Sequence, residues 1–183
     1  MTIGIMDPTA LLHKYLDPNR ELFGIVYRHS RSVADFALAV LDSHPTLAAD
    51  RQFVEQASLL HDIGCVKTNA PSICCYGTEP YIRHGVLGAE ILRAEGLPRH
   101  ARVCERHTGT GLTLAAIESQ HLPLPLQDLS PETLEEELIC FADKFFSKTK
   151  LDRQRSAAEA RQKLEKFGPE SLARFDNWCE RFL

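Results

Sequence analysis

Apolar residues recur at helical spacing along most of the chain. Between residues 20 and 43 they form one stripe of a long predicted helix, at Leu22, Val26, His29, Val33, Phe36, Ala37 and Val40. The same spacing predicts a short helix from Pro8, helices over residues 50–64, 81–96 and 98–107, a helix that begins at Ser130-Pro131, and two amphipathic helices on either side of Gly168-Pro169. Sustained alternation of apolar and polar residues is nearly absent, so the pattern predicts an all-α fold.

Two segments interrupt this periodicity. Residues 65–80 show no clear period, and residues 118–133 contain three of the ten prolines, so both are predicted to be largely irregular. Gly64 stands where the helix over residues 50–64 should end.

Length and composition narrow the class of protein. A chain of 183 residues suits one domain with a hydrophobic core. No run of 18 or more apolar residues exists, so we expect no membrane span, and the first residues lack the features of a secretory signal. The six cysteines form no CxxC pair and are expected to be reduced thiols, as in a cytoplasmic protein.

Charge is unevenly distributed. The net charge of −4 gives no strong signal for nucleic acid or an anionic membrane. Residues 132–143 hold five acids and no base, whereas residues 144–166 hold eight bases against three acids. The basic segment could attract phosphate, but a solvated helix face is the favoured interpretation.

Several predicted helices bring a potential metal ligand to or beside an apolar face. These residues are His29, His61 with Asp62, His84, His107 and Asp143. Each histidine alone would suit a hydrogen-bonded core position. Several buried imidazoles and carboxylates together need a shared partner, because burying them unpaired is costly. A metal centre would satisfy them all.

The ordered blocks that carry these residues resemble a known family. "YRHSRSVADFA", "SLLHDIG", "RHGVLGAEIL", "ERHTGTG" and "ICFADKF" are similar to the HD superfamily of metal-dependent phosphohydrolases, HDIG subgroup, between about Glu21 and Lys148. Within it, the likeness is greatest to small bacterial and archaeal HDIG proteins and to symmetrical diadenosine tetraphosphate hydrolases. The resemblance implies an HD-domain helical bundle over residues 1–150 with a di-metal centre between core helices. Residues 151–183 are expected to form amphipathic helices packed on the same domain, although they could instead serve a homodimer interface.

The resemblance also implies a ligand set. His29, His61, Asp62 and Asp143 would hold one divalent ion, and Asp62 would bridge to a second ion held by His84 and His107. Imidazole and carboxylate ligands suit iron, manganese, nickel or zinc, and the resemblance favours iron. Neighbouring helical residues point about 100° apart, so His61 can face one ion while Asp62 reaches between two.

The implied activity is hydrolysis of a phosphoester or phosphoanhydride by a metal-bridging hydroxide. The expected substrate is a nucleotide or another small phosphorylated molecule. The predicted catalytic residues are Asp62, Lys144 and Arg28, and the predicted substrate-binding residues are Lys67, Arg83, Arg106, Thr108 and Lys148. Cys65 follows "HDIG" where many relatives have lysine. We expect the loops over residues 65–80 and 120–131 to border the pocket.

Two other functions use the same ligands. Some HD-fold proteins are di-iron oxygenases that open a carbon bond with O₂, and a non-catalytic metal-bound nucleotide sensor would also keep all six ligands. The basic residues near Asp143 favour phosphate chemistry.

Overall fold

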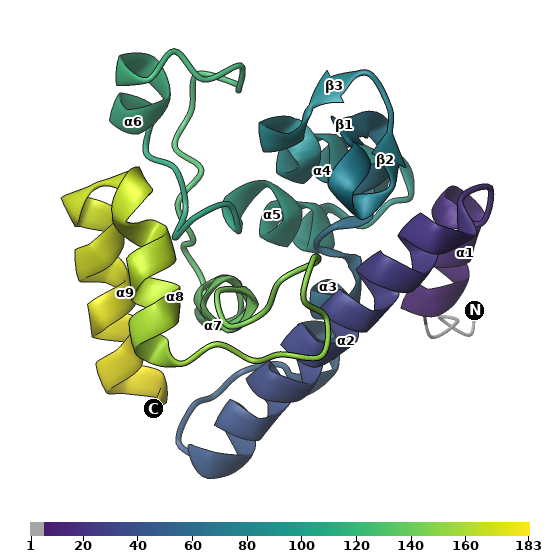
Figure 1. Ribbon diagram of the computed structural model, residues 1–183. Helices are drawn as coiled ribbons and strands as arrows, with labels where there is room; N and C mark the ends of the chain where they lie inside the picture. The colour runs from purple at the N-terminus through teal and green to yellow at the C-terminus, as the bar shows by residue number, and fades with distance from the viewer. Residues whose placement is uncertain (1–5) are drawn as a thin grey trace.

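The computed structural model describes residues 6–183 and consists mainly of helices (Figure 1). The α-helices are α1 (Pro8–Leu16), α2 (Arg20–Ser43), α3 (Arg51–Leu60), α4 (His84–Ala94), α5 (Pro98–Arg106), α6 (Leu114–Ser119), α7 (Leu134–Asp143), α8 (Ala157–Leu164) and α9 (Pro169–Phe182). Short 3₁₀ helices are η1 (Ile63–Lys67), η2 (Pro71–Ile73), η3 (Tyr81–Arg83) and η4 (Glu165–Phe167). The predicted all-α class is confirmed, and no described helix is long and apolar enough to cross a membrane.

The long helix α2 packs against both α3 and α7, and its apolar stripe contributes to the main core. Aromatic rings of α7 and α9 meet in the same core, where Phe141 lies 5.5 Å from Phe175 and 5.4 Å from Phe182 between ring centroids. Helices α8 and α9 lie side by side at one end of the molecule, coloured yellow in Figure 1. The apolar face of α9 is therefore buried in the core, while the domain boundary near residue 150 stays a prediction.

Gly64 has a different role from the one expected. Helix α3 ends at Leu60, and Gly64 lies in η1, pressed against α4. A Cβ atom on Gly64 would come within 2.1 Å of the His84 carbonyl oxygen and 2.3 Å of the Gly88 nitrogen. Gly64 therefore permits the close approach that brings the segment after α3 against the start of α4.

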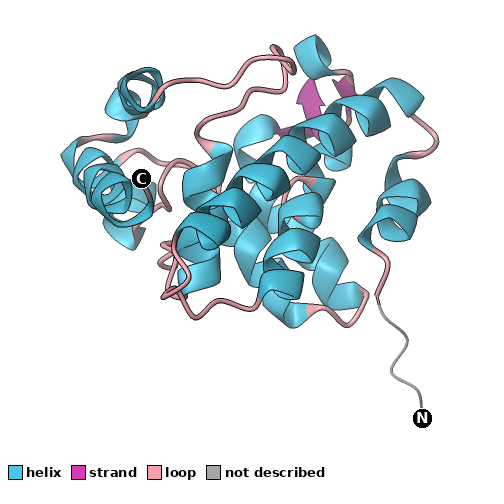
Figure 2. Cartoon of the chain, turned by 90° about the horizontal axis from the view of Figure 1, so that it is seen from below, coloured by secondary structure: helices cyan, strands magenta, loops and turns pink. Residues whose placement is uncertain are grey.

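The segment predicted as an irregular loop contains a small sheet, coloured magenta in Figure 2. Its strands are β1 (Thr68–Ala70), β2 (Cys75–Tyr76) and β3 (Glu79–Pro80), in the order β2-β1-β3. Strand β1 pairs antiparallel with β2 and parallel with β3. Strands of two or three residues are too short to show the alternation by which a strand is recognised.

The region before α7 also differs from the prediction. The N-cap of α7 is Thr133, which forms a capping box with Glu136, so the helix begins after the predicted Ser130-Pro131 start. The short helix α6 was not expected. It begins at a Thr113 cap just before the proline-rich segment.

Candidate metal centre

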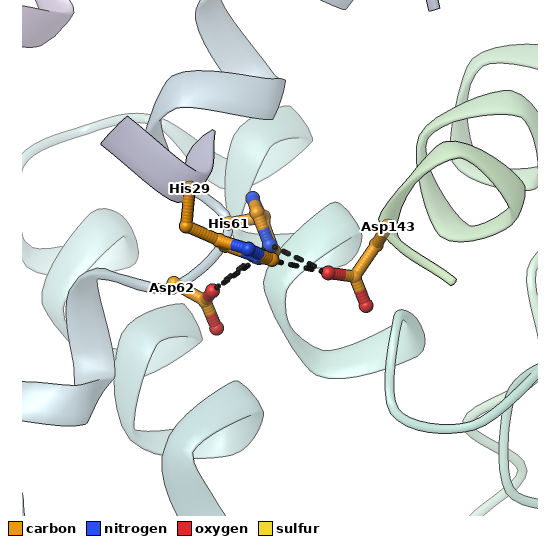
Figure 3. Close-up of side chains that lie close together, drawn as sticks. All are labelled: His29, His61, Asp62 and Asp143. Carbon is orange, nitrogen blue, oxygen red and sulfur yellow. Dashed lines mark hydrogen bonds and ion pairs between the residues drawn. The ribbon is translucent and has the colours of Figure 1, made fainter. Parts of the chain in front are cut away.

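The structure brings the six predicted ligands together from five helices. His29 lies within α2, whereas His61, Asp62, His84, His107 and Asp143 lie at or just beyond helix ends. Figure 3 shows His29, His61 and Asp62 facing Asp143, which reaches toward them from α7. All six side chains are largely buried, and Asp143, the most exposed, keeps 13% of its side-chain surface. The fold therefore gathers a dense polar cluster inside an apolar bundle.

The cluster divides into two groups that share Asp62. His29, His61, Asp62 and Asp143 form one group, and Asp62, His84 and His107 form the other. In the first group, Asp62 Oδ2 lies 3.2 Å from His29 Nε2 and 3.0 Å from His61 Nε2. In the second, Asp62 Oδ1 lies 3.5 Å from the Nε2 atoms of both His84 and His107. The two oxygens of one carboxylate thus face different histidine pairs.

Main-chain hydrogen bonds orient three of the imidazole rings. The Nδ1 atoms of His61, His84 and His107 lie 2.6, 2.7 and 2.6 Å from the carbonyl oxygens of Ser58, Tyr81 and Cys104, respectively. These acceptors assign the proton to Nδ1 and direct the Nε2 lone pair toward the cluster, as in metal-binding histidines.

The arrangement fits bound metal ions. His84 Nε2 and His107 Nε2 are only 2.9 Å apart, and with both protons on Nδ1 these two lone pairs would repel without a cation. Among the described residues, the buried His61 Nε2 and Asp62 Oδ2 also have no hydrogen bond of proper geometry. Nitrogen and oxygen donors with no thiolate suit iron, manganese, nickel or zinc.

The electrostatic environment keeps most of the six predicted ligands in the protonation state that binds metal, which is neutral for an imidazole and ionised for a carboxyl group. Burial, together with the neighbouring His107, lowers the pKa of His84 to about 3, so its ring is neutral near pH 7. Burial would raise the pKa of Asp62, but the positive charges of His61 and Lys148 hold it well below its usual range. Burial opposes protonation of His61, but Asp62 and Asp143 raise its pKa to about 9, so its Nε2 carries a proton near pH 7 that a metal ion would have to displace. Burial likewise opposes ionisation of Asp143, and Lys144 and His29 hold its pKa low. Both carboxylates are therefore charged at neutral pH.

Two predicted lysines adjoin the centre. Lys148 Nζ lies 2.6 Å from Asp62 Oδ2. Lys144 Nζ lies 2.7 Å from Asp143 Oδ2 and donates a 2.8 Å hydrogen bond to the His107 carbonyl oxygen. Both side chains line a cavity of about 750 Å³ that also contacts His29, His84, His107 and Asp143. Thr108 lines the same cavity, while its role in substrate binding stays a prediction.

Four other predicted residues lie away from this cavity. Arg28 is exposed and pairs with Asp152 at 2.5 Å, and Lys67 is exposed and lies 3.8 Å from Glu90. Arg83 pairs with Glu79 at 2.5 Å, and Arg106 pairs with Glu132 at 2.9 Å. Proximity in sequence to a ligand therefore did not decide which cations line the cavity: Lys144 lines it and Arg28 does not, because adjacent residues on a helix project in different directions.

The sequence interpretation missed part of the cavity wall. The basic segment 144–166, expected to be a solvated face, contributes Lys144, Lys148, Arg155, Lys163 and Lys166 to the wall. The loop over residues 65–80 contributes as predicted, through Ala70, Ser72 and Ile73, whereas residues 120–131 contribute none of the lining. The excess of basic residues over acidic ones in this segment was the sequence feature that could have indicated a role in the site. Only the packing of α8 shows which of these basic residues line the cavity.

A family comparison agrees with this geometry. The model of the family described as "HD domain" matches residues 26–147, which include all six clustered residues. The chain belongs to the HD domain family. The predicted HD superfamily membership and HD-domain bundle are thereby confirmed, whereas the HDIG subgroup stays a prediction.

Relatives of this HD domain protein include larger proteins. An uncharacterized protein of Methanocaldococcus jannaschii, MJ0778, is 37% identical over 128 residues, which cover 68% of each chain. The tRNA (cytidine(56)-2'-O)-methyltransferase of Picrophilus torridus is 39% identical over 124 residues, covering 67% of this chain and 32% of that protein. Its Thermoplasma volcanium counterpart is 34% identical over 152 residues, which cover 76% of this chain and 40% of that protein. The chain thus spans about a third of the length of the first of these methyltransferases.

Solved structures share the fold of this HD domain protein. The HD domain of the L. monocytogenes phosphodiesterase PgpH in complex with cyclic-di-AMP matches with a TM-score of 0.55 and 20% identity, over 92% of both chains. A second structure of that domain matches with a TM-score of 0.55 and 19% identity, over 91% of this chain and 93% of that one. At this level of identity the likeness shows a common fold.

Proposed function

We propose that this HD domain protein is a metal-dependent phosphohydrolase that cleaves a phosphoester or phosphoanhydride of a nucleotide or another small phosphorylated molecule. The observation that carries the proposal is the pair of ligand groups sharing Asp62, with Lys144 and Lys148 lining the same cavity. A phosphodiesterase domain of similar fold binds a cyclic dinucleotide, which supports a nucleotide substrate.

In this proposal each ligand group holds one divalent ion. His29, His61, Asp62 and Asp143 hold the first ion, and Asp62 with His84 and His107 holds the second. Iron is the first choice, with manganese, nickel or zinc as alternatives. When bound, such ions supply a water activated for attack and neutralise charge on phosphate oxygens.

The chain's own residues position the substrate. The ammonium groups of Lys144 and Lys148 border the cavity beside Asp143 and Asp62, where they can attract an anionic phosphate group. Gly109 adopts a φ of +61°, a conformation that glycine tolerates without strain, and it lines the cavity next to Thr108. The Thr108 side chain and the Gly109 backbone are therefore placed to contact substrate.

A panel of nucleotides tests the proposal. Metal-loaded protein is incubated with nucleoside mono- and triphosphates, diadenosine polyphosphates and cyclic nucleotides, and phosphate and nucleotide products are measured together. We expect turnover of at least one compound, and its loss in Asp62→Asn. The matched control is Asp42→Asn, because Asp42 is an exposed residue of α2 that pairs with Arg51 and does not line the cavity.

Two results would contradict the proposal. Binding of a nucleotide without any turnover would indicate a metal-bound sensor. Substrate loss that consumes oxygen and releases no phosphate would indicate an oxygenase.

A further inference from the structure

The cavity over the metal centre extends far beyond the ligands. Its volume of about 750 Å³ lies in the range of about 300–1,000 Å³ typical of sites for whole small molecules. The ligands form one part of its lining, and α8 with η4 forms another through Gln162, Lys163, Lys166 and Phe167. A substrate that fills the cavity therefore contacts both parts.

The basic residues of the cavity fall into two sets. Lys144 and Lys148 adjoin the metal centre, where each also pairs with one of its carboxylates. Arg155 donates hydrogen bonds to the carbonyl oxygens of Lys144 and Phe146. Lys163 and Lys166, by contrast, are exposed and form no ion pair within residues 6–183. Their charge is available to a ligand.

Nearby acids compensate only part of this charge. Glu159 of α8 accepts from the Ser156 nitrogen and pairs with Arg153. Glu165 is the one acid besides the predicted ligand Asp143 that lines the cavity within the described chain. Two lysines against one glutamate leave this part of the wall net positive.

The wall is fixed in position by its packing. Ala160 and Leu164 are buried in the main core, and Arg161 makes bonds of 2.8 and 2.9 Å to both carboxylate oxygens of Asp176 in α9. Phe167 packs against the turn after His107, where a Cβ atom on Gly109 would lie 3.3 Å from its ring. The Lys166 ammonium lies 5.0 Å from the Phe167 ring centroid. The wall is thus held against the turn that adjoins the metal centre.

We propose that Lys163 and Lys166 form a second anion subsite, so that the substrate carries a second phosphate group beyond the one at the metal centre. This inference rests on the proposed function for the first phosphate. Both lysines lie outside the matched family segment of residues 26–147, so the subsite belongs to the C-terminal part of this chain. The ligand class is a nucleotide with two separated phosphates or a polyphosphate chain.

Calorimetry on the metal-loaded chain of 183 residues tests the subsite. The probes are adenosine 5′-monophosphate, which has one phosphate group, and adenosine 3′,5′-bisphosphate and ATP, which have more than one. We expect the bisphosphate or ATP to bind about tenfold more tightly than the monophosphate, since one added charge-assisted contact is worth about 1.4 kcal/mol or more. The double substitution Lys163→Ala with Lys166→Ala should abolish this advantage and leave monophosphate binding within about twofold.

Two control variants separate the subsite from general effects. Lys163→Arg with Lys166→Arg keeps the charge and should keep the advantage. Lys150→Ala removes an exposed positive charge from the same basic segment, but Lys150 does not line this cavity, so the variant should also keep the advantage. The inference is overturned if wild type shows no advantage, or if the double alanine variant retains it. If no compound is hydrolysed but the advantage appears and depends on the lysines, the proposed function fails and the subsite stands.

Discussion

At the scale of single residues, the adjacent His61 and Asp62 show how the six predicted ligands divide into two groups. His61 Nε2 faces only the first ligand group, while the two oxygens of Asp62 face both groups. The pair lies between the end of α3 and the start of η1, where the chain leaves the helix and neighbouring side chains can serve different positions. The two groups should therefore be separable by mutation.

Substitution in the second group should remove one ion only. We expect wild type to bind two divalent ions per chain, His84→Ala to bind one and Asp62→Ala to bind neither tightly, because Asp62 belongs to both groups. Elemental analysis of reconstituted and desalted protein measures the ratio. His13→Ala, which changes an exposed histidine of α1, is the control. Two ions retained by His84→Ala would exclude this division of ligands.

Removal of the Lys148 ammonium group should strengthen metal binding but slow turnover of the substrate. Its ammonium lies 2.6 Å from Asp62 Oδ2, so it repels a cation at the centre but attracts a phosphate. We expect Lys148→Met to bind metal more tightly and to lose about 10²-fold in kcat, as for loss of one preorganised electrostatic contact. Metal titration and steady-state kinetics measure the two effects, with the exposed Lys150→Met as control. Weaker metal binding in Lys148→Met would show a structural role instead.

At the scale of elements, the contact between η1 and α4 sets the spacing of the centre. It brings Asp62, just before η1, to His84 at the start of α4. Gly64 makes this contact possible, because any side chain there would meet the backbone of α4.

Gly64→Ala should therefore destabilise the fold and weaken metal binding. The added methyl group would meet main-chain atoms that cannot rotate away, so we expect a loss of about 1–3 kcal/mol in the free energy of unfolding. Gly24→Ala is a matched control, because its Cβ would meet nothing within 4 Å, and in α2 it should stabilise by about 0.5–1 kcal/mol. Denaturant unfolding measures both, and equal stability of the two variants would refute the proposed role of this contact.

The sequence predicted those features of the fold and of the candidate site that depend on the pattern of residues within a single helix. Apolar periodicity predicted α2, and the ordered blocks gave all six clustered residues, because each lies on or next to a helix whose buried face is visible in the sequence. The positions of cations such as Arg28 and Lys163 were not predictable. They depend on how whole helices pack, and the spacing within one helix does not specify that.

At the scale of the whole molecule, the centre joins elements that are distant in sequence. Its residues come from α2, the segment after α3, α4, the end of α5 and α7, so bound ions would link most of the bundle. Ligands that bind only the native state stabilise it by mass action.

Chelation should therefore lower the melting temperature. We expect EDTA to reduce the Tm of metal-loaded protein by about 5–10 °C, the shift for a loss of a few kcal/mol in a domain of this size. Asp62→Ala should show no further decrease with chelator, because it binds no metal tightly. Differential scanning calorimetry measures these shifts, and a chelator effect equal in both proteins would indicate a nonspecific action.

The most direct test of the central claim is anaerobic turnover in ¹⁸O-labelled water by the metal-loaded protein. A phosphohydrolase needs no oxygen gas and transfers one water oxygen to the phosphorus of its product. We predict that wild type acts on its best nucleotide substrate without O₂, that one ¹⁸O atom enters the phosphate product, and that Asp62→Asn forms none. Absence of turnover without O₂, followed by substrate loss when O₂ is admitted, would contradict the account.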